Sequence, residues 1–339
     1  MTRLPFSRAL PVCAVLILFI ACTAGCTVNV SVPDVTVPDI TVPSLPGTPE
    51  PTPTPIIIPT LEETATPTPT VTVAPPAANG TIRIGAFNIQ VFGVTKAGKP
   101  EVMDVLAQII RTYDLVAVQE VRDSSGTALP ALLEAVNADG SNYTYVASER
   151  LGRTSSKEQY AYFYDRSTVE LTAPGATYPE PEGTDPFHRQ PFIAPFAARD
   201  GTFDAVYIVI HTDPDEATEE IDALDAVVEY ARGIYPAEQD FIVLGDLNAD
   251  GSYFDEDGAT TMRGEEYTWL ITNDFDTTTK STDVTYDRII ITDGAGTDYA
   301  GEAGVFRFDT VYGLNQTMTE DVSDHYPVYA VFWTGRDGD

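Results

Sequence analysis

Cysteine is almost missing from this chain. Among its 339 residues only Cys13, Cys22 and Cys26 carry a thiol, and all three lie close to the N-terminus. The remainder of the chain therefore has no disulfide, no cysteine nucleophile and no thiolate ligand for zinc. Any chemistry there must come from carboxylates, amides, hydroxyls or the few histidines.

Positive charge is also scarce. Lysine and arginine number 19 against 51 acidic residues, a net charge of −32, and only Lys96, Lys99, Lys157 and Lys280 are lysines. Proteins exposed to high salt often carry such a surface, because salt screens the self-repulsion, so a halophilic protein is one interpretation and a merely acidic surface is the other. Both disfavour nonspecific attraction to polyanions.

Residues 1–26 have the features of an export signal. Arg3 and Arg8 precede an apolar stretch that is too short for a comfortable membrane span and is followed by small residues. The segment TAGC is similar to a lipoprotein cleavage box in which Cys26 would be lipidated, although Thr23 replaces the usual leucine. The alternative is an uncleaved signal anchor, and either would tether the protein to the outer face of a membrane.

Residues 27–79 are of low complexity, with repeated VPD, TVP and TPTPT units. Proline fixes φ and removes amide donors, so this segment favours extended polyproline conformations over a packed core. The sequence therefore predicts a stalk between the signal and a folded domain that spans residues 80–339.

The folded domain alternates strand-like and helix-like patterns. Short apolar, β-branched or aromatic runs indicate strands, among them TIRIGAFNI, DLVAVQEV, DAVYIVIHT, DFIVLGDLNA, YDRIIIT and YPVYAVFW. Apolar residues at helical spacing mark PEVMDVLAQIIRTY, ALPALLEAVNA and EATEEIDALDAVVEYARGIY. Because many strands are apolar along their whole length, both faces should be covered, which predicts a layered α/β domain. Periodicity leaves open whether it has one sheet or two.

Polar side chains interrupt or end several of these strands. A charged or amide group there is costly to bury unless something pairs with it. One such residue is readily explained as a hydrogen-bonded core or turn group, whereas six favour a shared site. The six are Asn88, Glu120, His211, Asp246, Asn248 and Asp287.

Two of the three histidines have candidate carboxylate partners. A histidine titrates near neutral pH and suits proton transfer, and a carboxylate on its far nitrogen fixes the tautomer and stabilises the charged ring. The candidate pairs are His211 with Glu158 and His325 with Asp287. For His188, in DPFHRQP, we favour a structural role.

Glu120 and Asn88 offer oxygen ligands only, which suits a hard cation such as Mg²⁺ or Mn²⁺ and does not suit zinc. Hard-metal ligands beside two acid/base histidines and amide donors fit metal-assisted hydrolysis of a phosphate ester.

A family resemblance emerges from these motifs. FNIQVFG, YDLVAVQEVRDS, LGRTSSKEQY, GDLNAD, STDVTYDRI and SDHYPV, in this order, closely resemble deoxyribonuclease I within the endonuclease/exonuclease/phosphatase superfamily. The resemblance covers residues 80–333. It implies a four-layer sandwich in which two packed mixed β-sheets are flanked by helices, with the site at one edge.

The resemblance also implies roles for individual residues. Glu120 with Asn88 would hold the metal, Glu158 would orient His211 and Asp287 would orient His325. One ring would take a proton from the attacking water and the other would protonate the leaving O3′. We assign His325 as base and His211 as acid, and the reverse assignment stays open. The residues implied to position the phosphate and the water are Asp246, Asn248 and Asp324.

The implied substrate is double-stranded DNA. Arg122 matches the family residue that enters the minor groove, which would give weakly sequence-specific contact. Gln90 and Ser156 stand where the family has an arginine and a groove-stacking tyrosine, and these changes together with the acidic charge should weaken duplex binding. The residues that match positions near the DNA backbone are Arg153, Arg189, Tyr253 and Tyr286.

The family's calcium and disulfide positions are only partly kept. Asp276, Thr278 and Thr282 match a structural Ca²⁺ loop, and the alternative is a polar turn without metal. At the second family calcium loop Asp185 remains, but Gln190 replaces a glutamate, so we expect weak binding or none. A family disulfide is absent, because Gly251 and Val284 occupy its two positions.

The sequence thus predicts a membrane-tethered or secreted, metal-dependent DNA endonuclease that acts as a monomer. One alternative is a phosphodiesterase of the same superfamily that acts on RNA, a nucleotide or a lipid headgroup. Another is an inactive surface binding or adhesion module. The retained histidine–carboxylate pairs argue against the inactive module, because a pure binder has no need of them.

Overall fold

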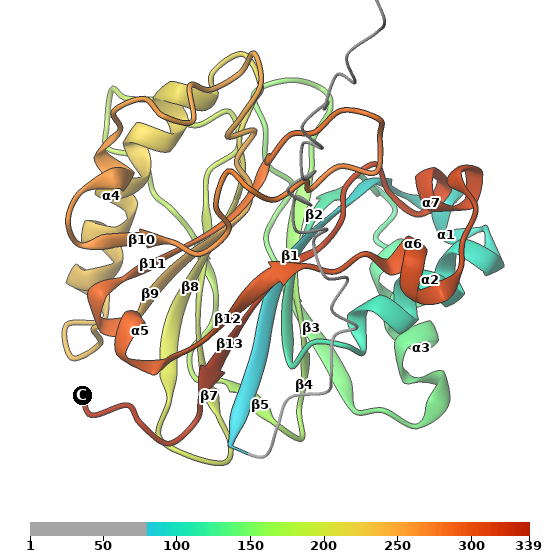
Figure 1. Ribbon diagram of the computed structural model, residues 1–339, viewed down its shortest axis with the longest axis horizontal. Helices are drawn as coiled ribbons and strands as arrows, with labels where there is room; N and C mark the ends of the chain where they lie inside the picture. Colours follow the sequence, from blue (N-terminus) through green and yellow to red (C-terminus); the bar gives the residue numbers. More distant parts are fainter. Residues whose placement is uncertain (1–79) are drawn as a thin grey trace, which may run out of the picture. The chain divides into compact units, whose positions relative to one another are not determined.

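The computed structural model describes residues 80–339, and they form two mixed β-sheets packed face to face with helices on both outer sides (Figure 1). The predicted signal at residues 1–26 and stalk at 27–79 lie outside the described residues. Within residues 80–339, none of the helices combines the length and the apolar character that crossing a bilayer requires.

The first sheet has six strands in the order β12-β13-β1-β2-β4-β3. Its two central strands, β1 and β2, are parallel, and the other neighbours are antiparallel. The strands are β1 (Thr81–Phe92), β2 (Leu115–Val121), β3 (Tyr143–Ala147), β4 (Gln159–Asp165), β12 (Tyr299–Val305) and β13 (Val328–Trp333).

The second sheet follows the order β10-β11-β9-β8-β7-β5, with β6 added beside β7. Here β8 and β9 are the parallel central pair. The strands are β5 (Val169–Leu171), β6 (Ala176–Thr177), β7 (Phe192–Ala198), β8 (Asp204–His211), β9 (Phe241–Asp246), β10 (Tyr267–Trp269) and β11 (Asp287–Thr292).

The helices divide between the two outer faces (Figure 1). Those on the first sheet are α1 (Val94–Ala97), α2 (Pro100–Ile110), α3 (Ala128–Val136), α6 (Phe308–Tyr312) and α7 (Gln316–Val322). Those beside the second sheet are α4 (Ala217–Ile234) and α5 (Asp293–Asp298), and the short 3₁₀ helices are η1 (Asn137–Asp139) and η2 (Thr261–Arg263).

Alternation along the strands explains the layering. In β8, Tyr207 and Val209 join the cluster between the two sheets, whereas Ile208 and Ile210 join the cluster beneath α4. A third cluster lies between the first sheet and its helices. Because successive side chains point to opposite faces, a strand buried on both sides reads as a continuous apolar run. Three cores separate four layers, so the predicted four-layer sandwich is confirmed and the question of one sheet or two is settled as two.

The sheet topology brings the polar strand ends to one edge. The parallel strands β8 and β9 end at His211 and Asp246, which lie opposite each other in the register. β11 runs antiparallel to β9 and begins at Asp287, opposite the same Asp246. The preceding Gly245 has a φ of 140°, and a Cβ there would lie 1.9 Å from the carbonyl oxygen of Ile210. Only glycine permits this close approach of the two strands.

Candidate active site

The edge of the first sheet is distorted where it meets the site. The register of β1 with β2 shifts between Asn88 and Phe92, and Gln90, Val91 and Glu120 have positive φ values of 37°, 50° and 61°. Such values are uncommon for residues other than glycine and are typically kept where function requires them. The bulge places the backbone N–H of Val91 2.7 Å from Glu120 Oε2, which orients this carboxylate.

The first predicted histidine pair is present. His211 Nδ1 lies 2.9 Å from Glu158 Oε2, and both side chains are buried. Glu158 Oε1 also receives the guanidinium of Arg122 at 2.8 Å. Burial raises the pKa of Glu158, but His211, Arg189 and Arg122 outweigh it and lower that pKa to about 2. Glu158 therefore stays ionised and holds the imidazole in one orientation.

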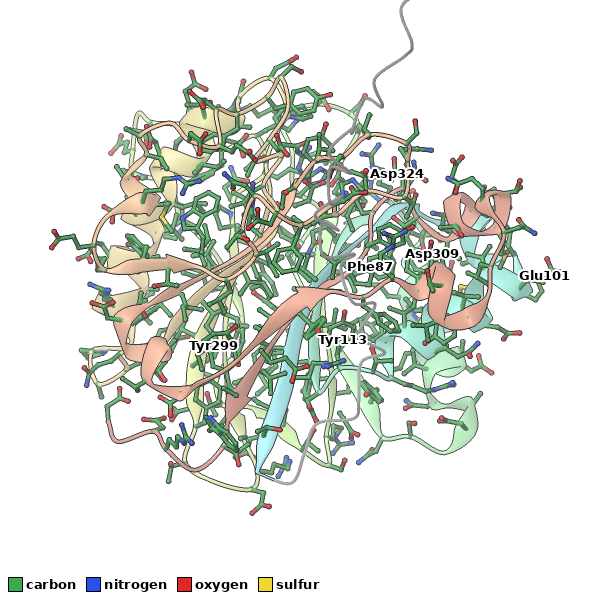
Figure 2. The ribbon with its side chains drawn as sticks, in the orientation of Figure 1. Phe87, Glu101, Tyr113, Tyr299, Asp309 and Asp324 are labelled. Atoms are coloured by element: carbon green, nitrogen blue, oxygen red, sulfur yellow. The ribbon has the colours of Figure 1, made fainter. Side chains whose placement is uncertain are left out.

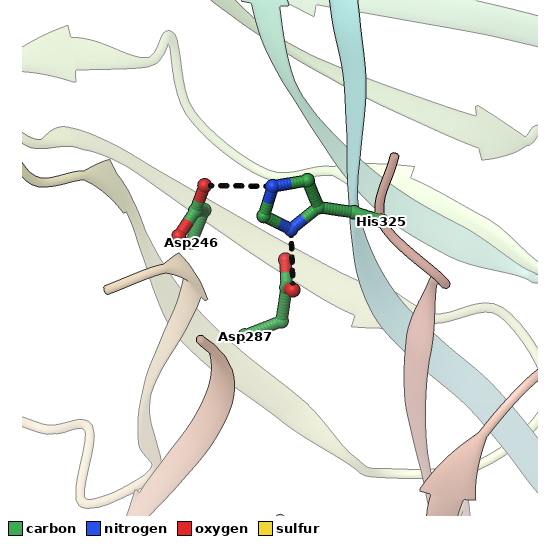
Figure 3. Close-up of side chains that lie close together, drawn as sticks. All are labelled: Asp246, Asp287 and His325. Carbon is green, nitrogen blue, oxygen red and sulfur yellow. Dashed lines mark hydrogen bonds and ion pairs between the residues drawn. The ribbon is translucent and has the colours of Figure 1, made fainter. Parts of the chain in front are cut away.

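The second pair is present as well. His325 Nδ1 lies 2.8 Å from Asp287 Oδ2, and its other nitrogen points toward Asp246 (Figure 3). Thr278 forms an isolated bridge with His325, and Ser323 Oγ accepts the N–H of His325 and donates to the carbonyl of Asn88 at 2.6 Å. The turn of SDHYPV is thus fixed to both sheets.

Asp246 joins the two pairs. Its Oδ2 lies 3.4 Å from Nε2 of His211 and 3.6 Å from Nε2 of His325. The same oxygen accepts the amide N–H of Asn88 at 2.9 Å, and Oδ1 accepts the backbone N–H of Asn248. The two free imidazole nitrogens therefore converge on one carboxylate oxygen.

The two rings differ in their charged surroundings. Burial acts to lower the pKa of His325, but Asp287 and Asp246 outweigh it and raise that pKa to about 10. The pKa of His211 is also raised, although burial and Arg189 oppose the effect of Glu158 and Asp246. Arg189 therefore weakens the effect of the carboxylates on the pKa of His211.

The two predicted metal ligands, Glu120 and Asn88, lie side by side, and their role as ligands stays a prediction. Glu120 Oε1 faces the site and accepts an amide N–H of Asn88 at 3.2 Å. The amide oxygen of Asn88 accepts the N–H of Gln90 at 2.9 Å, so Asn88 presents its nitrogen to both carboxylates. In this geometry Glu120 offers an anionic oxygen to a hard cation, whereas Asn88 positions it through a hydrogen bond.

Asp324 and Asn248 flank the same point. Asp324 Oδ1 lies 3.9 Å from Nε2 of His325 and is buried with no hydrogen-bond partner among the described residues. Figure 2 shows Asp324 at the edge where the loops of both sheets meet. The amide of Asn248 donates to the carbonyl of Thr212, and Asn248 has a φ of 46°. A buried carboxylate oxygen without a donor indicates a place for a cation or a water.

The predicted calcium loop supports the catalytic turn. Thr278 donates to Asp276 Oδ1 and to the carbonyl of Thr282, both at 3.0 Å, so the three predicted ligand residues lie together. The next residue, Thr279, donates its N–H to the carbonyl of Asp324 at 2.8 Å. Whether calcium binds here stays a prediction, but the loop is tied directly to the turn that carries His325.

Some of the predicted DNA contacts lie at the surface of the site. Arg122 is 31% exposed in its side chain and bridges Glu120 and Glu158 at 3.1 and 2.8 Å. The rings of Tyr253 and Tyr286 lie 5.6 Å apart, and Tyr286 lies 6.1 Å from the ring of His325. These two tyrosines lead from the ring of His325 to the solvent.

Arg153 and Arg189 are placed differently. Arg189 is only 5% exposed and donates to the carbonyls of His211 and Thr212 at 2.9 and 2.8 Å. This burial does not favour the direct backbone contact predicted from the sequence, and it makes Arg189 a support beneath the site. Arg153 is ion-paired with Asp185 and Glu216. Its guanidinium also donates to the carbonyl of Asp185.

Several supporting residues were missed by the sequence analysis. Lys96 donates to the carbonyls of Ile89 and Val322 at 2.9 and 3.0 Å, and burial lowers its pKa to about 8 against the opposing effect of Asp324 and Glu120. Glu220, fully buried, accepts the backbone N–H of His188. His188 itself lies 3.3 Å from Asp213, outside the two catalytic pairs. No pattern in the sequence marks Lys96 or Glu220, because each acts through main-chain contacts.

Two imidazole–carboxylate pairs that face a shared carboxylate, with an oxygen ligand for a hard cation beside them, define a site for hydrolysing phosphoesters. The model of the Endonuclease/Exonuclease/phosphatase family matches residues 85–325. The chain therefore belongs to this family, as a deoxyribonuclease I-like member that hydrolyses phosphodiester bonds.

Curated relatives carry the same likeness. The chain is 36% identical over 262 residues to deoxyribonuclease gamma of Rattus norvegicus, a match that covers 73% of this chain and 83% of that protein. It is 38% identical over 259 residues to deoxyribonuclease-1 of Homo sapiens, covering 73% of this chain and 91% of that protein.

Solved structures share the fold at much lower identity. An endonuclease/exonuclease/phosphatase family protein from Bacteroides thetaiotaomicron matches with a TM-score of 0.51 at 16% identity, covering 74% of this chain and 95% of that one. The human Nocturnin catalytic domain matches with a TM-score of 0.52 at 15% identity, covering 75% and 93%. These likenesses support the four-layer architecture alone.

Proposed function

We propose that this protein is an extracellular, membrane-tethered endonuclease that cleaves DNA with low sequence specificity and depends on a divalent cation. The observation that carries the proposal is the convergence of His211 Nε2 and His325 Nε2 on Asp246, at 3.4 and 3.6 Å. Both rings face one point, as water activation and leaving-group protonation at a single phosphorus require.

The two rings divide the proton transfers. Water attacks the phosphorus in line with the bond that breaks, one ring accepts the water proton and the other donates a proton to the leaving O3′. We propose His325 as the base and His211 as the acid, with the reverse assignment as the alternative, and neighbouring carboxylates raise the pKa of both rings. The side-chain amide of Asn88 and the backbone N–H of Asn248 donate to Asp246 and so hold its carboxylate between the rings.

The residues present fit a hard divalent cation. Glu120 offers Oε1, and the buried Asp324 Oδ1 lacks a hydrogen-bond partner among the described residues. Mg²⁺ or Mn²⁺ prefers such oxygen donors, and we propose Glu120 as its main protein ligand, with Asn88 beside it. The cation would stabilise negative charge that develops on the phosphoryl oxygens. The Asp276 loop is our proposed structural Ca²⁺ site.

DNA is the substrate that the relatives support. Deoxyribonuclease gamma and deoxyribonuclease-1 are more than a third identical to this chain over most of the folded part. Arg122 is partly exposed next to the histidine–carboxylate pairs and can follow a narrow groove, and Tyr253 gives an exposed ring beside Tyr286. Contacts of this kind respond to groove shape and give weak sequence preference.

The proposed cellular setting rests on features of the sequence. The export signal at residues 1–26 supports a secreted or lipid-anchored protein, with the stalk at 27–79 as spacer. The net charge of −32 supports activity at high salt, where repulsion between the protein and DNA is screened. We propose a monomer, because the site is complete within one chain.

A phosphodiesterase acting on RNA, a nucleotide or a lipid headgroup is the second candidate. Gln90 and Ser156, at the family's arginine and tyrosine positions, favour it because they weaken the grip on duplex DNA. Ser156 Oγ accepts from Arg122 at 3.4 Å, so the serine supports the arginine in place of stacking on a sugar.

Plasmid nicking tests the proposed function. The purified protein is incubated with supercoiled plasmid, Mg²⁺ and Ca²⁺ across a salt series, and in parallel with a small phosphodiester. We expect relaxed and linear plasmid, no product in EDTA, and none from His211→Ala or His325→Ala. Hydrolysis of the small diester without nicking at any salt would reject DNA as the substrate and keep the chemistry.

A further inference from the structure

A second group of acidic residues lies at the opposite ends of the strands that carry the site. β8 ends at His211 but begins at Asp204, and β9 ends at Asp246 but follows directly on Asp240. Because β8 and β9 are parallel, the starts of both strands lie at the edge remote from the catalytic residues. Figure 1 shows the C-terminus at this edge, near α5.

The carboxylates of this group come close enough to share a cation. Ligand atoms of Asp240, Asp298 and Asp337 all lie within 4.8 Å of one another, and so do those of Glu238, Asp240 and Asp339. Asp240 belongs to both sets. We call these five residues the tail cluster, because Asp337 and Asp339 belong to the C-terminal tail.

Two oxygens of the tail cluster are buried without a partner. Asp240 Oδ2 and Asp298 Oδ1 have no hydrogen bond among the described residues, and each residue is 1% exposed. No lysine, arginine or histidine of residues 80–339 forms an ion pair with any member of the cluster. The nearby Arg336 stacks on the ring of Trp333 at 4.3 Å. Buried carboxylate oxygens are normally satisfied, so these two point to a ligand.

Three other oxygens of the tail cluster accept backbone N–H groups. Glu238 Oε1 accepts the N–H of Gln239 and of Asp240 at 2.9 and 2.8 Å. Asp337 accepts the N–H of Asp204 through Oδ2 and that of Asp339 through Oδ1. The cluster is therefore organised around Asp240 before any ligand binds.

Asp298 is held by a side chain, because Thr297 Oγ1 donates to its Oδ2 at 2.9 Å. A Cβ at Gly294 would lie 2.3 Å from the carbonyl oxygen of Gln239 and 2.7 Å from Asp240 Oδ1, so only glycine lets α5 pack this closely. The close packing brings Asp298, the last residue of α5, beside Asp240.

Electrostatics agrees with the geometry. Burial together with Glu238 and Asp298 raises the pKa of Asp240 to about 8, and burial raises the pKa of Glu238 to about 7. Without a cation the cluster must hold protons near neutral pH or carry uncompensated repulsion. A divalent cation removes both penalties.

We propose that the tail cluster binds a hard divalent cation, with Ca²⁺ preferred over Mg²⁺, and that this ion ties the C-terminal tail to the starts of β8 and β9. The donors are carboxylate oxygens from three separate segments, which suits the larger and less regular coordination shell of calcium. The site is distinct from Glu120 and from the Asp276 loop, and it does not depend on the proposed activity.

Calcium titration by calorimetry at pH 7.5 tests this proposal. The wild-type protein, freed of metal with EGTA, is compared with the double variant Asp240→Asn/Asp298→Asn. Asp276→Asn reports on the loop near the catalytic turn, and Asp104→Asn is the control, because Asp104 is an exposed acid on α2. We expect the double variant to lose one bound calcium per chain that Asp276→Asn and Asp104→Asn both retain.

Proteolysis of the tail gives an independent readout. Calcium should slow cleavage after Trp333 in the wild type and in Asp276→Asn, and have no such effect in the double variant. Asp337→Asn, at the half-buried rim of the cluster, provides a milder second variant that should weaken the same calcium. Equal calcium stoichiometry in wild type and double variant, or tail cleavage that ignores calcium, would show a cluster that shares protons only and would overturn the proposal.

Discussion

Buried carboxylates at the two ends of the paired strands β8 and β9 have opposite surroundings and opposite pKa shifts. At the catalytic end, Asp246 accepts two N–H groups and faces two imidazole rings, and its pKa is lowered, because His325 and His211 outweigh burial. At the other end, Asp240 lies among four acids with no cation of residues 80–339 in ion-pair contact, and its pKa is raised to about 8.

This difference shows that burial alone does not decide the state of a carboxylate. Both aspartates are at most 2% exposed and lie on the same strand or directly before it. The charge and the hydrogen-bond donors around each group decide whether it is ionised. At the catalytic end, side chains of the protein balance the negative charge of Asp246. In the tail cluster, a ligand from outside would have to balance the charge.

The largest expected difference between the ends is in activity. His325→Ala or His211→Ala should lower kcat for DNA cleavage by about 10²–10⁴-fold, because each ring carries one proton transfer. Asp240→Asn should leave kcat within about twofold, since nothing at the tail cluster touches substrate. Initial rates of nicking measure both. A histidine variant that retains wild-type kcat would contradict the assigned roles.

In the absence of metal, a substitution at the catalytic end should lower the free energy of unfolding, whereas one at the tail cluster should raise it. Asp246→Asn removes the carboxylate that balances two rings, and we expect it to lower the free energy of unfolding by about 1–3 kcal/mol. Asp240→Asn removes a repelled carboxylate and should raise that free energy by on the order of 1 kcal/mol in EGTA.

Urea unfolding in EGTA measures both changes, and Asp104→Asn serves as the neutral control. Saturating Ca²⁺ should reverse the order of Asp240→Asn and the wild type, because only the wild type gains the ion. Destabilisation by Asp240→Asn in EGTA would show that its carboxylate is already satisfied.

The free energy of unfolding should fall with rising pH in two separate pH ranges, called here the lower and the upper window. The pKa of Asp240 is raised to about 8, so its contribution is present below about pH 4 and is lost as pH rises toward 8. The pKa of His325 is raised to about 10, so its contribution is complete below about pH 6.5 and is lost as pH rises through 10.

Unfolding in EGTA from pH 4 to 10 measures the two windows together. Asp240→Asn/Asp298→Asn should flatten the lower window and leave the upper one, and His325→Gln should remove the upper one. Calcium should flatten the lower window in the wild type. A single window that neither variant changes would contradict the assignment to these groups.

The smallest expected effect concerns the surface of the catalytic end. Tyr253→Ala should raise KM for duplex DNA by several-fold, about 1 kcal/mol, because an exposed ring beside Tyr286 is lost. Turnover of a small phosphodiester should not change, since Tyr253 does not contact either histidine pair. An equal loss on both substrates would show that the ring supports the site and does not bind DNA.

Much of the fold and the grouping of the site could be predicted from the sequence. Apolar runs that end in Glu120, His211 and Asp246 indicate buried strands with polar ends, and parallel strands bring such ends to one edge. The motif resemblance supplied the four-layer order, which the structure and the comparisons confirm. The catalytic roles of the grouped residues stay predictions.

The features that could not be predicted from the sequence depend on contacts between segments far apart along the chain. The orientation of the Asn88 amide is set by the bulge at Gln90, and the burial of Arg189 is set by the carbonyls after β8. The tail cluster joins residues from 238 to 339 that share no motif. An acidic residue in an acidic chain carries no local sign of the neighbours it will meet.

Arg153 places a positive charge of the protein itself beside the acidic residues of one loop. Its guanidinium bridges Asp185, at the family's second calcium loop, and Glu216 just before α4. Unlike a bound calcium ion, a side chain is not removed by a chelator or by dilution. The contact between the Asp185 loop and the start of α4 should therefore persist when free calcium falls. Anchoring by a side chain keeps this loop in place whatever the ion content of the surroundings.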